Sequence, residues 1–413
     1  MERLLHYVWK NRLMPTSGIK TTTNADVEIL SVGLHNKDAG PDFFSADVVI
    51  GGDDWMGNVE IHTRSSDWYR HGHDRDKAYN NVILHVVEEA DCEVKTELGR
   101  TVPQLVVKVP EFVISHYEQL QAYEDFPPCY RYAAQVAPFV RSRWMQRLCE
   151  ERLERKAADV AERLRYCEHN WEHAFFVTMA RAFGFGVNGD AFEQWARIIP
   201  YSGAAKHRDN MLQIEALFYG QAGFLDGDDA HRELLAQALP GRSYSALQKE
   251  YTFMSGKFSL TPMDAHCWRL LRTRPQNFPT MRLAQLASLY GKGRLSLSSA
   301  VEATTLDELR SMMDDAELTP TMSNLLILNG VVPSVYAYGR YRDSKKLRDK
   351  SLAWLGQLPA ENNKHTRQWQ QTGLPLESAA DSQAVVQLIT RYCARHDCLR
   401  CQYGYQYIKS QRD

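Results

Sequence analysis

Residues 40–62 read GPDFFSADVVIGGDDWMGNVEIH, and this stretch decides how the first part of the chain folds. Apolar and polar side chains alternate through residues 43–50, which is typical of a strand with one buried face. The GGDD turn then leads into a second run of this kind at residues 57–63. We therefore predict a hairpin, with Asp42 just before its first strand and Glu60 on its second.

Five further elements are expected around this hairpin: a helix at 2–13, a strand at 27–32, a polar helical stretch at 65–80, a strand at 82–87, and a hairpin of 92–97 with 104–109. The first helix carries its apolar residues on one face. The strand at 82–87 is almost entirely apolar, as expected of a strand buried on both faces. The order αβββαβ predicts a compact α/β domain over residues 1–110.

Beyond Pro110 the chain changes to helical periodicity. Apolar side chains recur at helical spacing through residues 141–165, and similar patterns follow towards the C-terminus. Glutamates interleave with the arginines of 141–165, so we interpret this basic stretch as a solvated helix face. Residues 111–413 are therefore predicted to form a mainly helical domain with a C-terminal cysteine cluster, which makes the whole chain an α+β protein.

The bulk composition is that of an ordinary globular protein. The 413 residues are enough for two or three domains, and 49 Lys+Arg against 51 Asp+Glu give a formal net charge of -2. This balance argues mildly against a nucleic-acid protein, although a local basic patch is compatible with it. The sequence has no signal peptide and no apolar run of the ~20 residues that span a bilayer. We expect a cytoplasmic protein with reduced cysteines and no membrane partner.

The two acids of the hairpin form a candidate metal site. Asp42 and Glu60 lie where their side chains can converge at one end of the sheet, and paired carboxylates suit Mg²⁺ or Mn²⁺. The backbone carbonyl of Ile61 could complete the ligands that the protein provides. A metal there would lower the pKa of a water and stabilise charge on a phosphoryl oxygen. The simpler interpretation is a turn aspartate and an exposed strand glutamate.

This pattern resembles the PD-(D/E)xK nuclease superfamily. Pro41-Asp42 matches the PD, and Glu60-Ile61-His62 stands where that family has acid-x-Lys. The resemblance implies a restriction-endonuclease-like fold and metal-dependent hydrolysis of DNA or RNA. The chain departs from the family at His62, because a neutral imidazole near pH 7 supports the reaction less well than a charged lysine.

Histidines gather close to the candidate site. His71 and His73 follow the hairpin, and His85 lies in the next strand, adjacent to the strand that carries His62. These side chains could position a water, donate to a scissile phosphate or bind zinc. Each histidine taken singly is more simply a turn residue or a core residue. A zinc-dependent hydrolase of a small molecule is therefore an alternative.

Near the C-terminus, Cys393, Cys398 and Cys401 form a C-x₄-C-x₂-C pattern, and the last pair has the spacing of a metal knuckle. Cys129 is the preferred fourth ligand, and His396 is the local one. The set would hold Zn²⁺ or an iron–sulfur cluster. The alternative is that these are buried thiols that serve packing.

A segment of the helical part combines arginines with aromatic residues: Arg269, Arg272, Arg274 and Arg282 with Trp268 and Phe278. Such a segment could contact phosphates and stack on bases. The simpler interpretation, which we prefer, is an interface between helices.

The whole chain is similar to a family of bacterial proteins known only as a domain of unknown function. Four phrases carry this similarity: GLHNKDAGPDFF, GNVEIHTRSSDWYRHGH, RPQNFPTMRLAQLA and CLRCQYG. The leading expectation is a divalent-metal-dependent nuclease that acts on DNA or RNA, with a helical domain that holds substrate or partner. The alternatives are a non-catalytic nucleic-acid or protein-binding module with a decayed site, and the zinc hydrolase.

Overall fold

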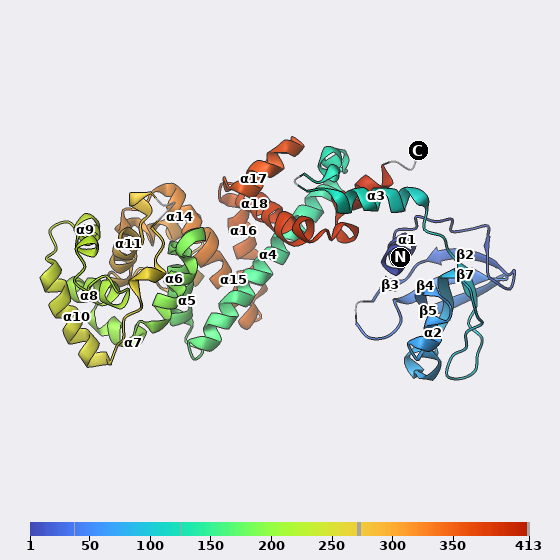
Figure 1. Cartoon of the computed structure of the whole chain (residues 1–413), viewed down its shortest axis with the longest axis horizontal. Coiled ribbons are helices and arrows are strands. Elements are labelled where there is room, and N and C mark those ends of the chain that lie inside the picture. Colours follow the sequence, from blue (N-terminus) through green and yellow to red (C-terminus); the bar gives the residue numbers. More distant parts are fainter. Residues whose placement is uncertain (37, 125, 271–273, 411–413) are drawn as a thin grey trace. The chain divides into compact units, whose positions relative to one another are not determined.

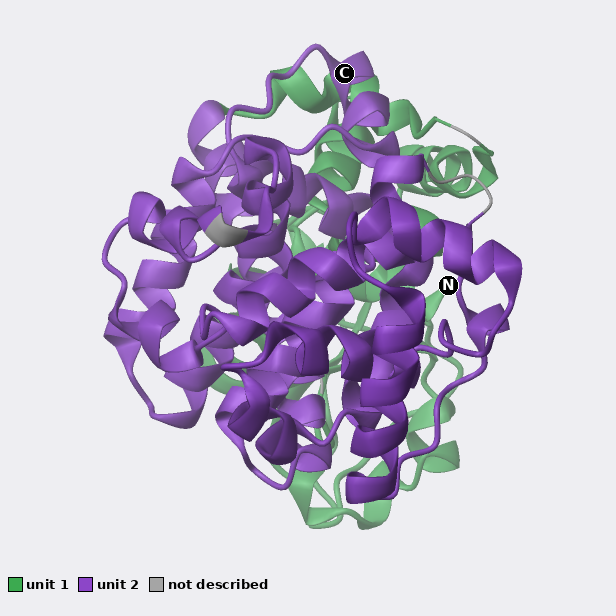
Figure 2. Cartoon of the chain, turned by 90° about the vertical axis from the view of Figure 1, so that its left-hand side faces the viewer, with its two compact units in different colours: residues 1–137, 391–413 green, residues 138–390 purple. Residues whose placement is uncertain are grey.

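The computed structural model describes residues 1–36, 38–124, 126–270 and 274–410. The chain forms two compact units, one of residues 1–137 with 391–413 and one of residues 138–390 (Figure 2). This division differs from the predicted boundary after residue 110, because both flanks of the helical part join the first unit. Within unit 1, Gln121 Nε2 donates to the His396 carbonyl at 3.0 Å, and the Tyr123 hydroxyl donates to the Cys393 carbonyl at 2.7 Å.

Unit 1 is built on a mixed seven-stranded sheet, whose described strands lie in the order β1-β2-β4-β5-β6-β7, with β3 on β4. Strands β2, β4 and β5 pair antiparallel, whereas β5, β6 and β7 pair parallel. The strands are β1 Ile19–Lys20, β2 Asp26–Ser31, β3 Leu34–His35, β4 Phe43–Ile50, β5 Asp53–Arg64, β6 Val82–Glu89 and β7 Gln104–Val106.

The predicted β4–β5 hairpin is confirmed. Its two-residue turn consists of Gly51 and Gly52, which both have positive φ, at 63° and 96°. Such a turn matches the natural twist of the paired strands, and glycine adopts it without steric cost. The hairpin therefore sets the register that places Asp42 and Glu60.

Two predicted elements differ in the structure. The stretch 65–80 forms a one-turn helix, α2 (Asp67–Arg70), and two short 3₁₀ turns, because Gly72 takes a left-handed φ of 76°. The prediction that 104–109 pairs with 92–97 is wrong. Strand β7 instead pairs parallel with β6 and extends the sheet. Residues 92–97 do not pair with β7, and they contribute an isolated antiparallel bridge between Lys95 and Thr101.

The sheet is covered by short helices (Figure 1). Helix α1 (Glu2–Lys10) packs against β5 and buries Leu5, Val8 and Trp9 completely. A second cluster gathers Trp68, Tyr79 and Val82 with two residues of the 92–102 fold-back. Unit 1 also contains α3 (Glu111–Ala122), a 3₁₀ segment (Pro128–Gln135) and α19 (Gln402–Lys409), which pack on one another.

Unit 2 is helical in its described residues, so the chain is a mixed α+β protein with a sheet-rich first part. Among the described helices, none is both long enough and apolar enough to cross a membrane. The helices are α4 Pro138–Tyr166, α5 Trp171–Phe183, α6 Phe185–Ile198, α7 Tyr201–Ala204, α8 Met211–Gln221, α9 Asp229–Ala238, α10 Tyr244–Phe258, α11 Pro279–Gly291, α12 Leu297–Glu302, α13 Leu306–Ser311, α14 Pro320–Leu326, α15 Val332–Tyr341, α16 Lys345–Gln357, α17 Lys364–Trp369 and α18 Ala379–Gln387.

Candidate metal centre

The carboxylates of Asp42 and Glu60 meet across the β4–β5 hairpin. Asp42 directly precedes β4, and its Oδ2 accepts a hydrogen bond from the Ile61 N–H at 2.9 Å. The Asp42 N–H in turn donates to Glu60 Oε2 at 3.1 Å. These reciprocal bonds hold the two acidic side chains together, with Glu60 only 5% exposed. The structure thus brings together the two acids that the sequence singled out.

A bulge in β4 lies beside this pair. Phe43 pairs with Val59 and Ala46 pairs with Gly57, so β4 contains one residue more than β5 over this interval. Ser45, inside the bulge, has a positive φ of 54°. Bulges bend a strand and re-aim neighbouring side chains, and they are frequent next to active sites.

Burial raises the pKa of both carboxyls above the usual range of acids. For Glu60, the charge of Asp42 is the next cause after burial. For Asp42, burial outweighs the lowering by His6 and by the Ile61 N–H. Two acids in a shielded place resist joint ionisation unless a cation lies between them. The pair therefore suits a hard divalent cation.

Helix α1 adds two groups that the sequence analysis missed. His6 Nε2 lies 3.4 Å from Asp42 Oδ2, and the charge of Glu2 raises the pKa of both Asp42 and Glu60. Glu2 and His6 are four residues apart and therefore share a helix face. The only available signal was two titratable residues on a helix that was expected to pack near the sheet.

Three histidines cluster beside Glu60. The ligand atoms of His62, His71 and His73 all lie within 4.8 Å of one another, and His71 is exposed. Glu60 Oε1 lies 3.2 Å from His73 Nε2 and 3.5 Å from His62 Nε2. The acids and the histidines therefore form one centre, to which β5 contributes Glu60 and His62 and the short turns after α2 contribute His73.

His85 lies behind this centre. It is fully buried on β6, and its Nε2 is 2.9 Å from His62 Nδ1. Burial lowers the pKa of His62 to about 2 and that of His85 to about 3, with neighbouring histidines as the next causes. Both rings are therefore neutral near pH 7, which is the form that binds metal. A partner on the far nitrogen orients a histidine ligand, and His85 is placed to do so for His62.

The four candidate cysteines gather in unit 1. The charges of Cys401, Cys393 and Cys398 reinforce burial in raising the pKa of Cys129. Among the described residues, however, no three of these sulfurs lie within 4.8 Å of one another. Cys393 Sγ instead lies 3.9 Å from the Tyr130 hydroxyl. His396, the local alternative, directs its Nδ1 towards the Leu120 carbonyl at 3.5 Å.

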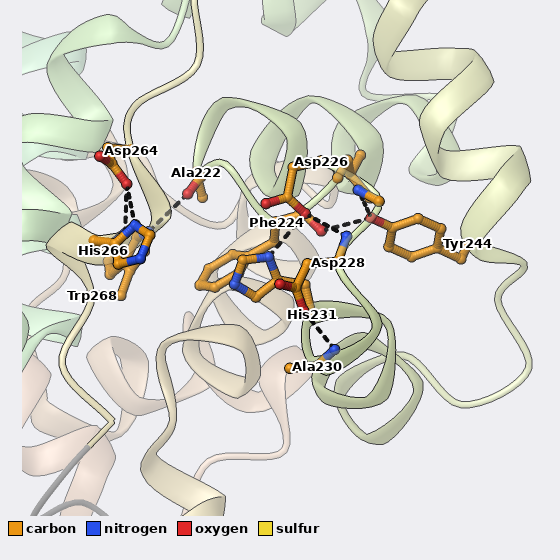
Figure 3. A network of polar contacts seen from close by, with 12 residues as sticks. Ala222, Phe224, Asp226, Asp228, Ala230, His231, Tyr244, Asp264, His266 and Trp268 are labelled. Carbon is orange, nitrogen blue, oxygen red and sulfur yellow. Dashed lines mark hydrogen bonds and ion pairs between the residues drawn. The ribbon is translucent and has the colours of Figure 1, made fainter.

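In the arginine-rich segment, Trp268 is a packing residue. The indole is 6% exposed and donates from Nε1 to the Ala222 carbonyl at 2.8 Å, beside the pair of Asp264 and His266 (Figure 3). An indole held in this way offers no face on which a base could stack. Arg272 lies outside the described residues.

These features define a class of protein: a mixed α+β chain with a largely buried cluster of carboxylates and histidines at the end of a β-hairpin. Residues 2–319 match the family described as "Protein of unknown function (DUF2851)", and the chain belongs to this family. Neither the curated proteins nor the solved structures contain a match to the chain.

Proposed function

We propose that the chain is a divalent-metal-dependent nuclease that hydrolyses phosphodiester bonds in DNA or RNA. The observation that carries this proposal is the pair of half-buried Asp42 and buried Glu60, held by reciprocal hydrogen bonds. The order of elements around the pair supports it: a leading helix, three antiparallel strands, a short crossover and a parallel strand. Apart from the two-residue strands β1 and β3, this order is similar to the αβββαβ order of the PD-(D/E)xK nucleases.

The residues present fit a divalent cation. The buried His73 Nε2 finds no hydrogen-bond partner among the described residues, although it lies 3.2 Å from Glu60 Oε1. Asp42 and Glu60 would hold Mg²⁺ or Mn²⁺. The Ile61 carbonyl would join them, because the N–H and C=O of one strand residue point to the same edge and the Ile61 N–H binds Asp42. The cation supplies charge for the phosphoryl oxygens and lowers the pKa of a water.

The histidines have separate roles in this proposal. His62 is held from behind by His85, and its Nε2 lies 3.1 Å from His71 Nδ1 and 3.5 Å from Glu60 Oε1, so the His62–His71 pair can position a water by hydrogen bonding. His71 is exposed and can donate to a phosphate oxygen of an incoming strand. Neither ring supplies the fixed positive charge of the family's lysine, so a cationic substrate-binding surface elsewhere would help.

The test is metal-dependent cleavage of single- and double-stranded DNA and of RNA by the full chain, with Mg²⁺ or Mn²⁺. Asp42→Asn and Glu60→Gln should abolish cleavage. The matched control is Asp54→Asn, an exposed acid on the same hairpin. Activity near that of the wild type in both site variants would refute the mechanism.

A zinc hydrolase is the second candidate, favoured by the close approach of His62, His71 and His73. Metal analysis of the purified protein separates the two. One tightly bound Zn²⁺ that is lost in His71→Ala and His73→Ala would favour the second. Weakly bound Mg²⁺ or Mn²⁺ that is lost in Asp42→Asn would favour the first.

A further inference from the structure

Unit 2 contains a cavity of about 610 Å³ between α4, α5, the turn at Ile327–Val331 and the start of α17. Cations outnumber acids in its wall. The charged side chains that line it are Arg152, Arg155, Lys156, Arg163, Arg181, Asp159 and Glu361, and His365 adds a titratable ring.

Four of these cations come from one helix. Arg152, Arg155, Lys156 and Arg163 follow one another on α4 at spacings of three, one and seven residues, which places them on one helix face. The sequence predicted a solvated face for this stretch. That prediction is wrong for these four residues, because none of them is exposed and all four line the cavity.

The cations near Lys156 are close enough to affect one another. Lys156 Nζ donates to Asn329 Oδ1 at 2.9 Å, and Asn329 lies in a π-helical turn. Burial, together with the charges of Arg152 and Arg155, lowers the pKa of Lys156 to about 7 against the opposing effects of Glu361 and Cys149. Crowded like charges cost free energy that a bound anion would offset. Single π turns occur often at functional sites.

Two buried nitrogens in the wall are also unsatisfied. Arg163 is 7% exposed, and although one of its terminal nitrogens pairs with Glu193, its Nε makes no hydrogen bond within the described residues. The same holds for His365 Nδ1. Both are positioned on the cavity wall. Buried donors without partners are rare in proteins and call for a ligand or ordered water.

We propose that this cavity binds the phosphoryl groups of an anion, either a free polyphosphate compound or the terminal phosphate of a nucleic-acid strand. Arg152, Arg155 and Lys156 would contact the phosphoryl oxygens, since arginine binds such oxygens in a bidentate manner. The volume suits a small molecule. The proposal does not depend on the nuclease activity, because the cavity and the metal centre share no residue.

The test is calorimetric titration of the full chain with sodium pyrophosphate at pH 8. Saturable binding is expected for the wild type, and Lys156→Met and Arg152→Gln should each weaken it at least tenfold. Arg165→Gln, an exposed cation on the same helix, is the matched control and should change binding less than twofold. Circular dichroism shows whether each variant is folded. Absence of saturable binding, or equal loss in the control, would overturn the proposal.

Proton uptake and competition experiments test the proposal further. Binding should draw close to one proton from the buffer at pH 8, because a phosphate beside Lys156 restores its charge, and Lys156→Met should abolish this uptake. Uptake unchanged in that variant would count against the site. ATP competing with pyrophosphate identifies a free ligand, and a 5′-phosphorylated oligonucleotide that competes better than its unphosphorylated form identifies a strand end. Asp42→Asn should bind pyrophosphate normally, even if the nuclease proposal fails.

Discussion

At the scale of single residues, the pairing of Asp42 with Glu60 makes the free energy of unfolding depend on pH. The pKa of Glu60 is raised in the fold, so the folded state holds a proton that the unfolded state releases as pH rises above the ordinary value near 4.5. Stability therefore falls with rising pH, by up to about 1.4 kcal/mol per pH unit for one proton.

We expect Glu60→Gln to remove this dependence in metal-free protein. The difference in unfolding free energy between the variant and the wild type should grow in favour of the variant from pH 5 to pH 8. Urea denaturation with a chelator present measures it, and Asp54→Asn serves as control. A constant difference across this range would show that Glu60 ionises normally.

His62 separates the two candidate functions. In a nuclease, His62→Lys restores the family's residue, so activity should be kept or raised. His62→Ala should lower it about 100-fold, the usual contribution of a proton-transferring or positioning group. In a zinc hydrolase, both variants lose a ligand and both lose activity. Cleavage rates at pH 7 and metal content, measured on the same preparations, decide between these outcomes.

At the scale of elements, the local patterns were predictable and the long-range pairings were not. The bounds of β4 follow from an alternation that is visible within eight residues. Strand β7 pairs with β6 because β6 has an unpaired edge once the other strands are in place. No local sequence pattern reveals that edge. For the same reason, the sequence identified Asp42, Glu60 and the histidines but not His6, whose role depends on where α1 packs.

The chain that returns from β5 to β6 passes so close to Gly57 of the hairpin that a side chain there would clash. A Cβ at Gly57 would lie 2.4 Å from Ile83 Cγ2 and 2.7 Å from the Asn81 carbonyl. We therefore expect Gly57→Ala to destabilise unit 1 by about 1–3 kcal/mol, as overpacking does. Gly256→Ala, in a helix with open space around the position, should instead stabilise the protein by about 0.5–1 kcal/mol. Chemical denaturation of both variants checks the pair.

The cysteines allow a metal test at this scale. If they hold zinc or an iron–sulfur cluster, their sulfur atoms must lie closer to one another than they do in this structure. Protein purified without oxygen should then contain zinc or iron that Cys398→Ser releases, together with a lower melting temperature. Cys149→Ser, a buried thiol of unit 2, is the control. Metal-free protein with an unchanged melting temperature would leave the cysteines a packing role.

At the scale of the whole molecule, two segments far apart in the sequence build unit 1. Residues 391–410 pack on α3 and on the 3₁₀ segment that contains Cys129, where Leu120 is buried. We expect deletion of 391–413 to expose this region and destabilise unit 1, while unit 2 stays folded. Limited proteolysis and the reactivity of Cys129 with a thiol reagent would show it. Unchanged protection of Cys129 in the deletion variant would contradict this account.

The discontinuity of unit 1 also orders events during synthesis. A ribosome that has completed residue 137 still has 276 residues to add before the segment 391–413 is complete. At roughly 5–20 residues per second this takes about 14–55 s. During that time residues 138–390 can fold on their own, while the nascent N-terminal sheet waits for its closing segment. A prematurely terminated product would therefore carry Asp42, Glu60 and the neighbouring histidines on an unfinished unit, open to chaperones and proteases.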